Sequence, residues 1–199
     1  MDISTNSSIR SLCVYCGSSP GRDPLFIQEA RELGTMLASH GIRLVYGGGD
    51  KGLMGAIAES VLAGSGEVLG IIPEFLLKSE QAGGADNLIG VDMRTVPDMH
   101  TRKRIMFEES DAFIAMPGGI GTLEELVEVL TWAQLGRHQK PVGLLNINGF
   151  WSPYVELIEH MADAEFLHNP PRAKPLVFSN ADEVMSGLLD ASLLSQQAG

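Results

Sequence analysis

The sequence predicts an α/β fold, an open and doubly wound parallel sheet formed by a single domain. Short β-prone runs alternate with helical patterns along the 199 residues, which is typical of consecutive βαβ units. Most of these runs are apolar throughout, as expected for strands that helices cover on both faces of a parallel sheet. Two glycine-rich turns stand where a strand should run into a helix, and in such sheets ligands bind beyond the carboxyl ends of the strands.

Each element follows from its local composition. Runs rich in apolar and β-branched residues predict strands, and windows with apolar residues three or four positions apart predict helices. The expected strands are Ser11–Cys16, Arg43–Tyr46, Glu67–Ile72, Arg94–Val96, Ala112–Met116, Pro141–Asn146 and Leu176–Phe178. The expected helices cover about residues 24–39, 53–63, 99–110, 122–135, 153–165 and 181–194.

The domain is expected to extend over residues 11–194. Residues 1–10 form a polar, flexible N-terminus without the apolar core of a signal peptide, and residues 195–199 form a frayed tail. Between the third and fourth strands, Lys78–Val91 is a polar loop with three glycines that is longer than an ordinary connection. Such loops are often functional, and simple disorder is the alternative reading.

The composition excludes several classes of partner. With 44% hydrophobic residues the chain can bury an ample core, whereas its formal net charge of −11 argues against nucleic acid and anionic membranes. A small anionic ligand is compatible with this charge if the cations are concentrated in one place. No apolar run reaches the roughly 18 residues that span a bilayer, so we expect no membrane association and a cytoplasmic location.

The two cysteines, Cys13 and Cys16, are spaced as in a redox pair or half of a zinc site. They lie inside an apolar run and not at the start of a helix, where a reactive thiol pair would be expected. No second pair of metal ligands follows them in the sequence. We therefore expect packed strand cysteines, with no metal and no redox function.

The first glycine-rich turn contains Gly47-x-Gly49-x-x-Gly52, which matches the dinucleotide-binding fingerprint literally. The usual form follows the first strand and has an acidic residue about 20 positions on, at a strand end. Here the turn follows the second strand, and the acid at that distance, Glu74, comes after Pro73. We expect no nicotinamide, flavin or other cofactor. A tight strand-to-helix turn or a wall of a nucleotide site fits this segment.

The second turn, Pro117-Gly118-Gly119-Ile120-Gly121-Thr122, lies between an expected strand and the amphipathic helix Leu123–Leu135. Free N–H groups and the dipole of such a helix favour a phosphate. Glu125 has two readings. Thr122-x-x-Glu125 is a capping box, in which Glu125 folds back onto the Thr122 N–H, or Glu125 is a catalytic carboxylate beside a phosphate site. The capping box leaves the adjacent glycines unexplained, which favours catalysis.

A third segment places cations at the start of a helix. Asp98 is expected to cap this helix, and Arg102, Lys103 and Arg104 then fall within its first turns, where the dipole disfavours positive charge. For Arg102 and Lys103 we expect a phosphate or carboxylate partner, and for Arg104 a solvated position. His100 is expected to have a capping or packing role.

Four segments occur in a characteristic order along the chain. They are Cys16-Gly17-Ser18-Ser19, Tyr46-Gly47-Gly48-Gly49 with Gly52-Leu53-Met54-Gly55, Met99-His100-x-Arg102-Lys103, and Pro117-Gly118-Gly119-x-Gly121-Thr122-x-Glu124-Glu125. In this order they resemble the LONELY GUY family of cytokinin riboside 5′-monophosphate phosphoribohydrolases, many of which are mislabelled as lysine decarboxylases. The resemblance extends from about Ser11 to Trp151.

The resemblance implies a Rossmann-like homodimer that hydrolyses the N-glycosidic bond of an adenosine monophosphate. The preferred base carries an isopentenyl-type group, and the products are free cytokinin and ribose 5-phosphate. By position, Arg102 and Glu125 match the two catalytic residues of the family. Substrate contacts are expected from Lys103, Gly118, Gly119, Ile120, Gly121, Thr122, Leu123, Glu124 and Thr131, from Glu80 in a loop longer than is usual in the family, and from Gly17, Ser18, Gly47 and Gly48.

In the expected mechanism, N–H groups of the second turn hold the 5′-phosphate, and Glu125 stabilises the positive charge on the sugar or orients the attacking water. Arg102 is expected to fix the phosphate or ribose and to keep Glu125 ionised. The alternative is a binding protein, because molybdenum-cofactor carriers look similar in fold and share a Gly-Gly-x-Gly-Thr-type turn. Lysine decarboxylation finds no support, since no Schiff-base lysine with an acidic partner for a pyridoxal ring can be identified.

Overall fold

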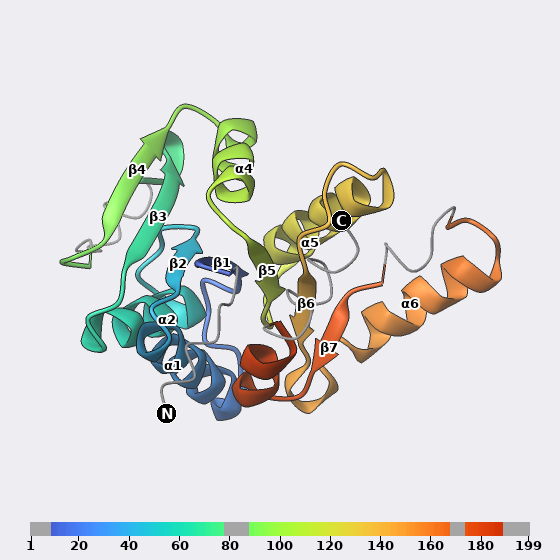
Figure 1. Cartoon of the computed structure of the whole chain (residues 1–199), viewed down its shortest axis with the longest axis horizontal. Helices are drawn as coiled ribbons and strands as arrows, with labels where there is room; N and C mark the ends of the chain where they lie inside the picture. Colours follow the sequence, from blue (N-terminus) through green and yellow to red (C-terminus); the bar gives the residue numbers. More distant parts are fainter. Residues whose placement is uncertain (1–8, 78–87, 168–173, 189–199) are drawn as a thin grey trace, which may run out of the picture.

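In the computed structural model, which describes residues 9–77, 88–167 and 174–188, seven parallel strands form one sheet (Figure 1). The strands lie in the order β4-β3-β2-β1-β5-β6-β7. Their bounds are β1 (Ser11–Tyr15), β2 (Arg43–Tyr46), β3 (Val68–Pro73), β4 (Asp92–Val96), β5 (Ala112–Ala115), β6 (Val142–Leu145) and β7 (Leu176–Phe178). The doubly wound parallel sheet that the sequence predicts is confirmed.

Helices connect the strands. They are α1 (Pro24–Ser39), α2 (Gly52–Ala63), α4 (Met99–Glu108), α5 (Ile120–Gln134) and α6 (Ser152–Asp163), with a short 3-10 turn η1 (Ile147–Gly149) and helical residues at 74–77 and 181–188. Asp23 caps α1 by accepting the Leu25 N–H at 3.0 Å. Asp98 accepts the Thr101 N–H at 2.8 Å and so caps α4, as expected.

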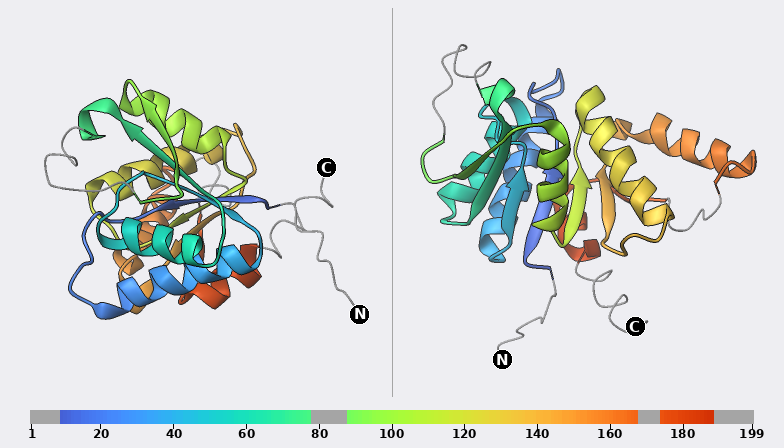
Figure 2. Two further views of the ribbon diagram at one scale, coloured as in Figure 1. Left: turned by 90° about the vertical axis from the view of Figure 1, so that its left-hand side faces the viewer. Right: turned by 90° about the horizontal axis from the view of Figure 1, so that it is seen from above.

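The inner strands of the sheet, β1, β2, β3, β5 and β6, are buried between two helical layers, which explains their largely apolar composition. The edge strands β4 and β7 are mostly exposed or half-buried. Alternate residues of β1 point to opposite faces of the sheet. Leu12 and Val14 belong to the cluster packed against α1 and α2, whereas Cys13 and Tyr15 belong to the cluster packed against α4 and α5. In the left view of Figure 2, α1 and α2 lie below the sheet and α4 lies above it.

The strand order reverses at β1, which pairs with β2 on one side and with β5 on the other. In open α/β sheets this reversal opens a crevice beyond the carboxyl ends of the strands, where ligands bind. The N–H of Gly17 donates to the carbonyl of Pro117 at 3.1 Å, and the N–H of Leu53 donates to the carbonyl of Gly17 at 3.1 Å. These two bonds bring the loops after β1 and β5 and the start of α2 to one place.

The start expected for the helix after the second glycine-rich turn is wrong. The helix α5 begins at Ile120, its N-cap is Gly119, and no side chain caps it. Thr122 therefore lies inside the first turn and is buried beneath the loop. The Thr122-x-x-Glu125 capping box does not form, because the helix has already begun when the chain reaches Thr122.

Other sequence expectations have mixed outcomes. Cys13 and Cys16 are buried free cysteines, as expected. In the N-terminal segment 1–10, Ile9 is buried, and the N–H of Arg10 donates a hydrogen bond to Asp111. Residues 1–8, most of the loop after β3 and the tail 195–199 lie outside the described residues. Within the described ranges, no helix combines the length and the apolar character that crossing a bilayer requires.

Candidate active site

A cavity of about 280 Å³ lies at the carboxyl end of the sheet, between the loops after β1, β2 and β5. Its wall combines glycine-rich and polar residues with apolar side chains. Arg102 and Glu125 face it from α4 and α5. The remaining lining residues are Val14, Tyr15, Cys16, Gly17, Ser18, Gly47, Met54, Leu76, Met106, Gly119, Gly121 and Thr122. The two catalytic candidates therefore share one cavity with both glycine-rich turns.

The three glycines of the second turn have different surroundings. A side chain at Gly118 would collide with the Thr122 side chain and would come within 3.0 Å of the Gly17 nitrogen. Side chains at Gly119 and Gly121 would meet nothing within 4 Å, and neither residue has a positive φ. Packing explains Gly118, but neither packing nor backbone strain explains the other two. A ligand that approaches the backbone closely does explain them.

The backbone beside these glycines can bind an anion. The first i to i−4 bond of α5 runs from the Leu123 N–H to the Gly119 carbonyl at 3.1 Å. The N–H groups of Ile120, Gly121 and Thr122 precede that bond and have no acceptor within the helix. Together with the positive end of the helix dipole, they favour a phosphate at this position.

Arg102 is held by the backbone of the sheet. Its Nε donates to the carbonyl of Ile71 at 3.1 Å, and its Nη2 donates to the carbonyl of Gly47 at 3.5 Å. The same Nη2 lies 3.6 Å from Oε1 of Glu125, and the two side chains are 11% and 10% exposed. The cation is therefore fixed next to the carboxylate before any ligand binds.

Glu125 is a buried carboxyl with a shifted pKa. Burial raises its pKa from 4.5 to about 7, and the positive charge of Arg102 opposes this shift only in part. Arg102 favours the ionised form of Glu125, as expected, but desolvation outweighs the ion pair, so the pKa stays above its usual value. A carboxyl with a pKa near 7 exchanges protons readily at neutral pH, which suits acid–base chemistry.

Lys103 holds α4 against α5. Its Nζ lies 2.6 Å from Glu124 and 3.0 Å from Glu128, on either side of Glu125 along the helix. Burial alone would lower the pKa of Lys103, but the two carboxylates outweigh it and the pKa is raised. The carboxylate partner expected for Lys103 is confirmed, whereas its partner Glu128 carried no signal in the sequence motifs.

The two thiols and the phenol near Glu125 are neutral. Burial raises the pKa of the Cys13 and Cys16 thiols and of the Tyr15 phenol far above neutrality, and the nearby charge of Glu125 adds to each shift. His100 is exposed at the start of α4, and Arg104 is an exposed partner of Glu108 at 3.6 Å, as expected for a solvated cation. The ionisable chemistry of the cavity thus lies with Arg102 and Glu125.

Several predicted contact residues lie away from this cavity. Gly48 has a φ of 80° and packs against Ile72 and Met93, and the Thr131 hydroxyl donates to the Val127 carbonyl on the exposed side of α5. Ile120, Leu123 and Glu124 are likewise not among the described residues that line the cavity. Glu80 lies outside the described residues. Substrate contacts by these residues stay predictions.

The apolar wall was not identified from the sequence. It comprises Met54, Leu76 and Met106, from α2, from the segment after β3 and from α4. Each of these residues belongs to an ordinary amphipathic pattern, so no local signal separates it from the core. Their place on the wall depends on contacts between distant segments.

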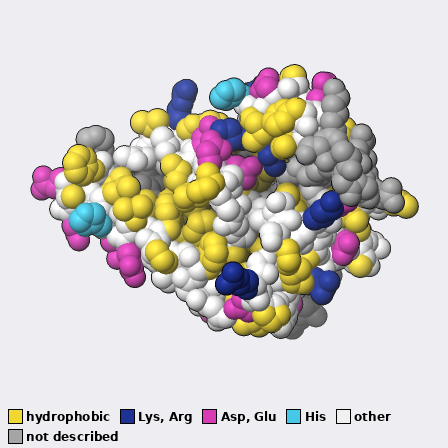
Figure 3. All heavy atoms as spheres, turned by 180° about the vertical axis from the view of Figure 1, so that it is seen from behind, with side chains coloured by type: hydrophobic (Ala, Val, Ile, Leu, Met, Phe, Trp, Pro, Cys, Tyr) yellow, Lys and Arg dark blue, Asp and Glu magenta, His cyan; other side chains and the backbone are white. Residues whose placement is uncertain are grey.

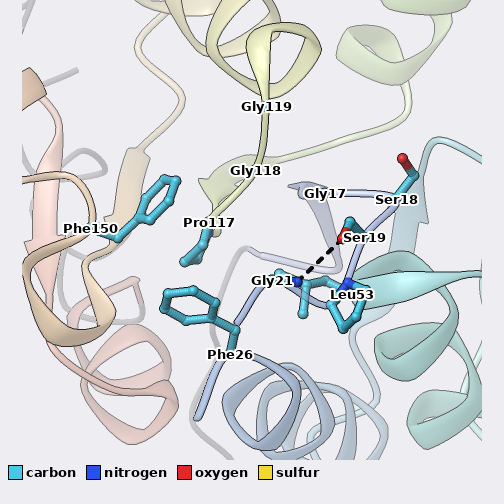
Figure 4. A pocket seen from close by; sticks show the side chains of 11 residues that line it. Gly17, Ser18, Ser19, Gly21, Phe26, Leu53, Pro117, Gly118, Gly119 and Phe150 are labelled. Carbon is cyan, nitrogen blue, oxygen red and sulfur yellow. Dashed lines mark hydrogen bonds between the residues drawn. The ribbon is translucent and has the colours of Figure 1, made fainter. Parts of the chain in front are cut away.

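A second cavity, of about 300 Å³, lies on the α1 side of the same strand ends (Figure 4). The rings of Phe26 and Phe150 meet edge to face there, with centroids 5.8 Å apart. Gly17 and Gly119 border both cavities. In Figure 4 the two rings and Pro117 lie on one side of the strand ends, and Ser18 and Leu53 lie on the other. The described lining of this cavity carries no ionisable side chain.

Comparison with known proteins shows the family of this chain. A family model described as "Possible lysine decarboxylase" matches residues 54–188. The Arabidopsis thaliana protein named "Cytokinin riboside 5'-monophosphate phosphoribohydrolase LOG7" is 46% identical over 186 residues, which is 92% of this chain and 83% of that protein. This chain belongs to the LONELY GUY family. The family resemblance that the four sequence motifs predict is confirmed.

Further matches place this LONELY GUY chain among its relatives. The Oryza sativa subsp. japonica protein named "Cytokinin riboside 5'-monophosphate phosphoribohydrolase LOG" is 48% identical over 166 residues, 83% of this chain and 67% of that protein. The solved structure of the molybdenum cofactor binding protein from Rippkaea orientalis has a TM-score of 0.63 at 23% identity, covering 90% of this chain and 95% of that one. That likeness shows a common fold alone.

Proposed function

We propose that this LONELY GUY chain is a phosphoribohydrolase that acts on nucleoside 5′-monophosphates. It hydrolyses the N-glycosidic bond of cytokinin ribotides, and of AMP, to give the free base and ribose 5-phosphate. The observation that carries the proposal is the Arg102–Glu125 pair, 3.6 Å apart, in a cavity that also contains an open helix N-terminus. The names of relatives that are 46% and 48% identical support it.

The geometry of α5 relates the phosphate site to the carboxylate. Gly121 and Glu125 are four residues apart, so they lie on the same face of the helix and about one turn, roughly 6 Å, from each other along its axis. A 5′-phosphate bound at the N–H groups of the first turn brings the ribose over the next turn. Glu125 then faces the sugar, and the base extends toward the apolar wall with Met54 and Leu76.

The reaction breaks the bond between C1′ and the base nitrogen. The electron pair of that bond goes to the base, and positive charge builds up on the sugar, as in glycoside hydrolysis. The ionised Glu125 stabilises this charge, and it accepts a proton from the water whose oxygen bonds to C1′. The departing base takes up a proton from solvent. Arg102 fixes the position of the ribose phosphate and favours the ionised form of Glu125.

We also propose that two copies associate, as the family resemblance implies. Ile120 is 82% exposed, and with Leu123, Phe150 and Leu157 it borders an apolar groove of about 450 Å³ between α5 and α6. No residue of α6 is buried. Figure 3 shows a broad band of hydrophobic side chains on the half of the molecule that carries α6. A second copy covering this face would bury it, and Leu157→Glu should then yield monomers in sedimentation velocity.

The test of the proposed function is base release, followed by chromatography. Isopentenyladenosine 5′-monophosphate and AMP are compared with the corresponding nucleosides, and Glu125→Gln is the inactive control. We expect free base from the two monophosphates and none from the nucleosides, with the rate ratio giving the preferred base. A folded protein that binds these nucleotides and releases no base would overturn the proposal that the chain is a hydrolase. It would favour a non-catalytic nucleotide carrier.

A further inference from the structure

Gly47 is a glycine that its own backbone does not require. Its neighbour Gly48 has a φ of 80°, which favours glycine, but Gly47 is not among the residues with positive φ. It is the first residue after β2, and it borders the candidate cavity. The reason for a glycine at this position must therefore lie in what surrounds it.

The surroundings of Gly47 are dominated by Arg102. A Cβ at this position would overlap Nη2 of Arg102, would lie 3.4 Å from its Cζ, and would lie 3.2 Å from Sδ of Met54. The carbonyl of Gly47 also accepts a hydrogen bond from Nη2 at 3.5 Å. We infer that Gly47 is a positioning residue for Arg102, because the place of its missing side chain is the space that the guanidinium occupies.

The guanidinium has little freedom to move elsewhere. Its Nε is bound to the Ile71 carbonyl at 3.1 Å, and its side chain is only 11% exposed. A methyl group at position 47 would push Nη2 away from the Gly47 carbonyl and change its 3.6 Å distance to Glu125. The resulting displacement is small, but displacements of about 1 Å in a catalytic group can lower a rate roughly 100-fold. This inference rests on the proposed function only where the rate is concerned.

The test is a double-mutant cycle with Gly47→Ala and Arg102→Ala, read by thermal unfolding and by activity. In the wild-type background, Gly47→Ala should lower the melting temperature by about 5 °C, as expected for overpacking in a chain of this size. In the Arg102→Ala background, the same change should alter it by less than about 1 °C, because the overlapping guanidinium is gone and the remaining close neighbour, Sδ of Met54 at 3.2 Å, belongs to a flexible side chain. The melting temperatures test the collision even if no substrate is turned over.

The activity arm tests the positioning role. Gly47→Ala should lower kcat about 100-fold and change KM less than about threefold, and it should leave the residual rate of Arg102→Ala unchanged. Because Arg102 lowers the pKa of Glu125, its displacement should also move the midpoint of the kcat/KM pH profile upward. A purely structural defect would not move that midpoint.

Gly34→Ala is the matched control, since a Cβ there would lie 2.6 Å from the Ile57 carbonyl, in the contact between α1 and α2. It should lower the melting temperature in both backgrounds and leave the pH midpoint unchanged. If Gly47→Ala alone does not fold but the double variant does, the inference is supported. Equal destabilisation by Gly47→Ala in both backgrounds, or a double variant that does not fold, would overturn it.

Discussion

The two glycine-rich turns border the same cavity, yet the space around their glycines is used in opposite ways. In the first turn the protein itself occupies that space, since side chains at Gly47, Gly52 and Gly55 would collide with Arg102, with the Ser18–Ser19 backbone and with the Asp50 carbonyl. In the second turn, side chains at Gly119 and Gly121 would meet nothing within 4 Å. The first turn supports the arginine, and the second leaves room for a ligand.

This difference shows that a glycine motif does not by itself identify a phosphate site. The first turn matches a dinucleotide fingerprint in sequence, but packing explains Gly47 and Gly55, and positive φ explains Gly48 and Gly52. The glycines that packing does not explain, Gly119 and Gly121, are those beside the free N–H groups of α5. The experiments below either sharpen this contrast or remove it.

The largest effect on activity is expected at Glu125, the carboxylate next to the second glycine-rich turn. Glu125→Gln should lower kcat about 1,000-fold and leave nucleotide affinity within a few-fold, because removal of one electrostatic or acid–base group typically has an effect of this size. Steady-state kinetics and equilibrium binding of AMP measure the two quantities. Unchanged kcat would show that the ion pair with Arg102 has no part in the chemistry.

The same substitution should stabilise the fold in a pH-dependent manner. The pKa of Glu125 rises from 4.5 to about 7 on folding, so its burial has no penalty below pH 4.5 and is progressively destabilising up to pH 7. Glutamine cannot ionise. The free energy of unfolding of Glu125→Gln relative to wild type should therefore increase by about 3 kcal/mol between pH 4.5 and pH 8. Urea unfolding at both pH values measures it, and a pH-independent difference would contradict the raised pKa.

Alanine in the two turns should have opposite effects on stability. Gly55→Ala should lower the free energy of unfolding by about 1–3 kcal/mol, because its Cβ collides with the backbone of Asp50. Gly121→Ala should raise it by about 0.5–1 kcal/mol, because alanine favours the helix and meets no neighbour. Chemical denaturation of each variant gives these values.

The role of the second glycine-rich turn in phosphate binding should be visible only when a ligand is present. The added methyl of Gly121→Ala lies where we place the phosphate, so KM for AMP should rise about tenfold, equivalent to 1.4 kcal/mol. If Gly121→Ala left KM unchanged, the second turn would not be the phosphate site, and the contrast between the two turns would disappear.

The smallest effect is expected one turn further along α5. Glu128→Gln removes a carboxylate that pairs with Lys103 at 3.0 Å and does not line the cavity in the described part of the chain. Activity should stay within about threefold of wild type, in line with the modest worth of a partly exposed ion pair. The variant is thus the charge-matched control for Glu125→Gln. If Glu128→Gln lowered activity as much as Glu125→Gln, the rate would depend on the negative charge of α5 in general and not on Glu125 in particular.

The sequence predicted the fold well because its signals are local. Uninterrupted apolar runs such as Ala112–Ala115 are long enough to specify buried parallel strands, and Asp98 specifies its own helix start. The start of α5 was misplaced because a glycine N-cap gives no side-chain signal, so Thr122 was the better candidate in the sequence. Arg102 and Glu125 were found through motif chemistry.

What the sequence could not show depends on contacts between distant residues. Gly47 and Arg102 are 55 positions apart, and only the folded sheet brings the guanidinium into the space beside the glycine. The shifted pKa of Glu125 likewise requires knowledge of its burial, because the neighbouring cation alone predicts a shift in the other direction. The ion pair of Lys103 with Glu128 depends on the packing of α4 against α5, so the sequence motifs did not indicate it.

The most direct test of the account is a crystal structure with ribose 5-phosphate bound. We predict that the phosphate accepts hydrogen bonds from the N–H groups of Ile120, Gly121 and Thr122, that the sugar faces Glu125, and that Arg102 keeps its bonds to the Ile71 and Gly47 carbonyls. A phosphate bound at the first turn, next to Gly48 and the start of α2, would contradict the assignment of the two turns and with it the proposed site.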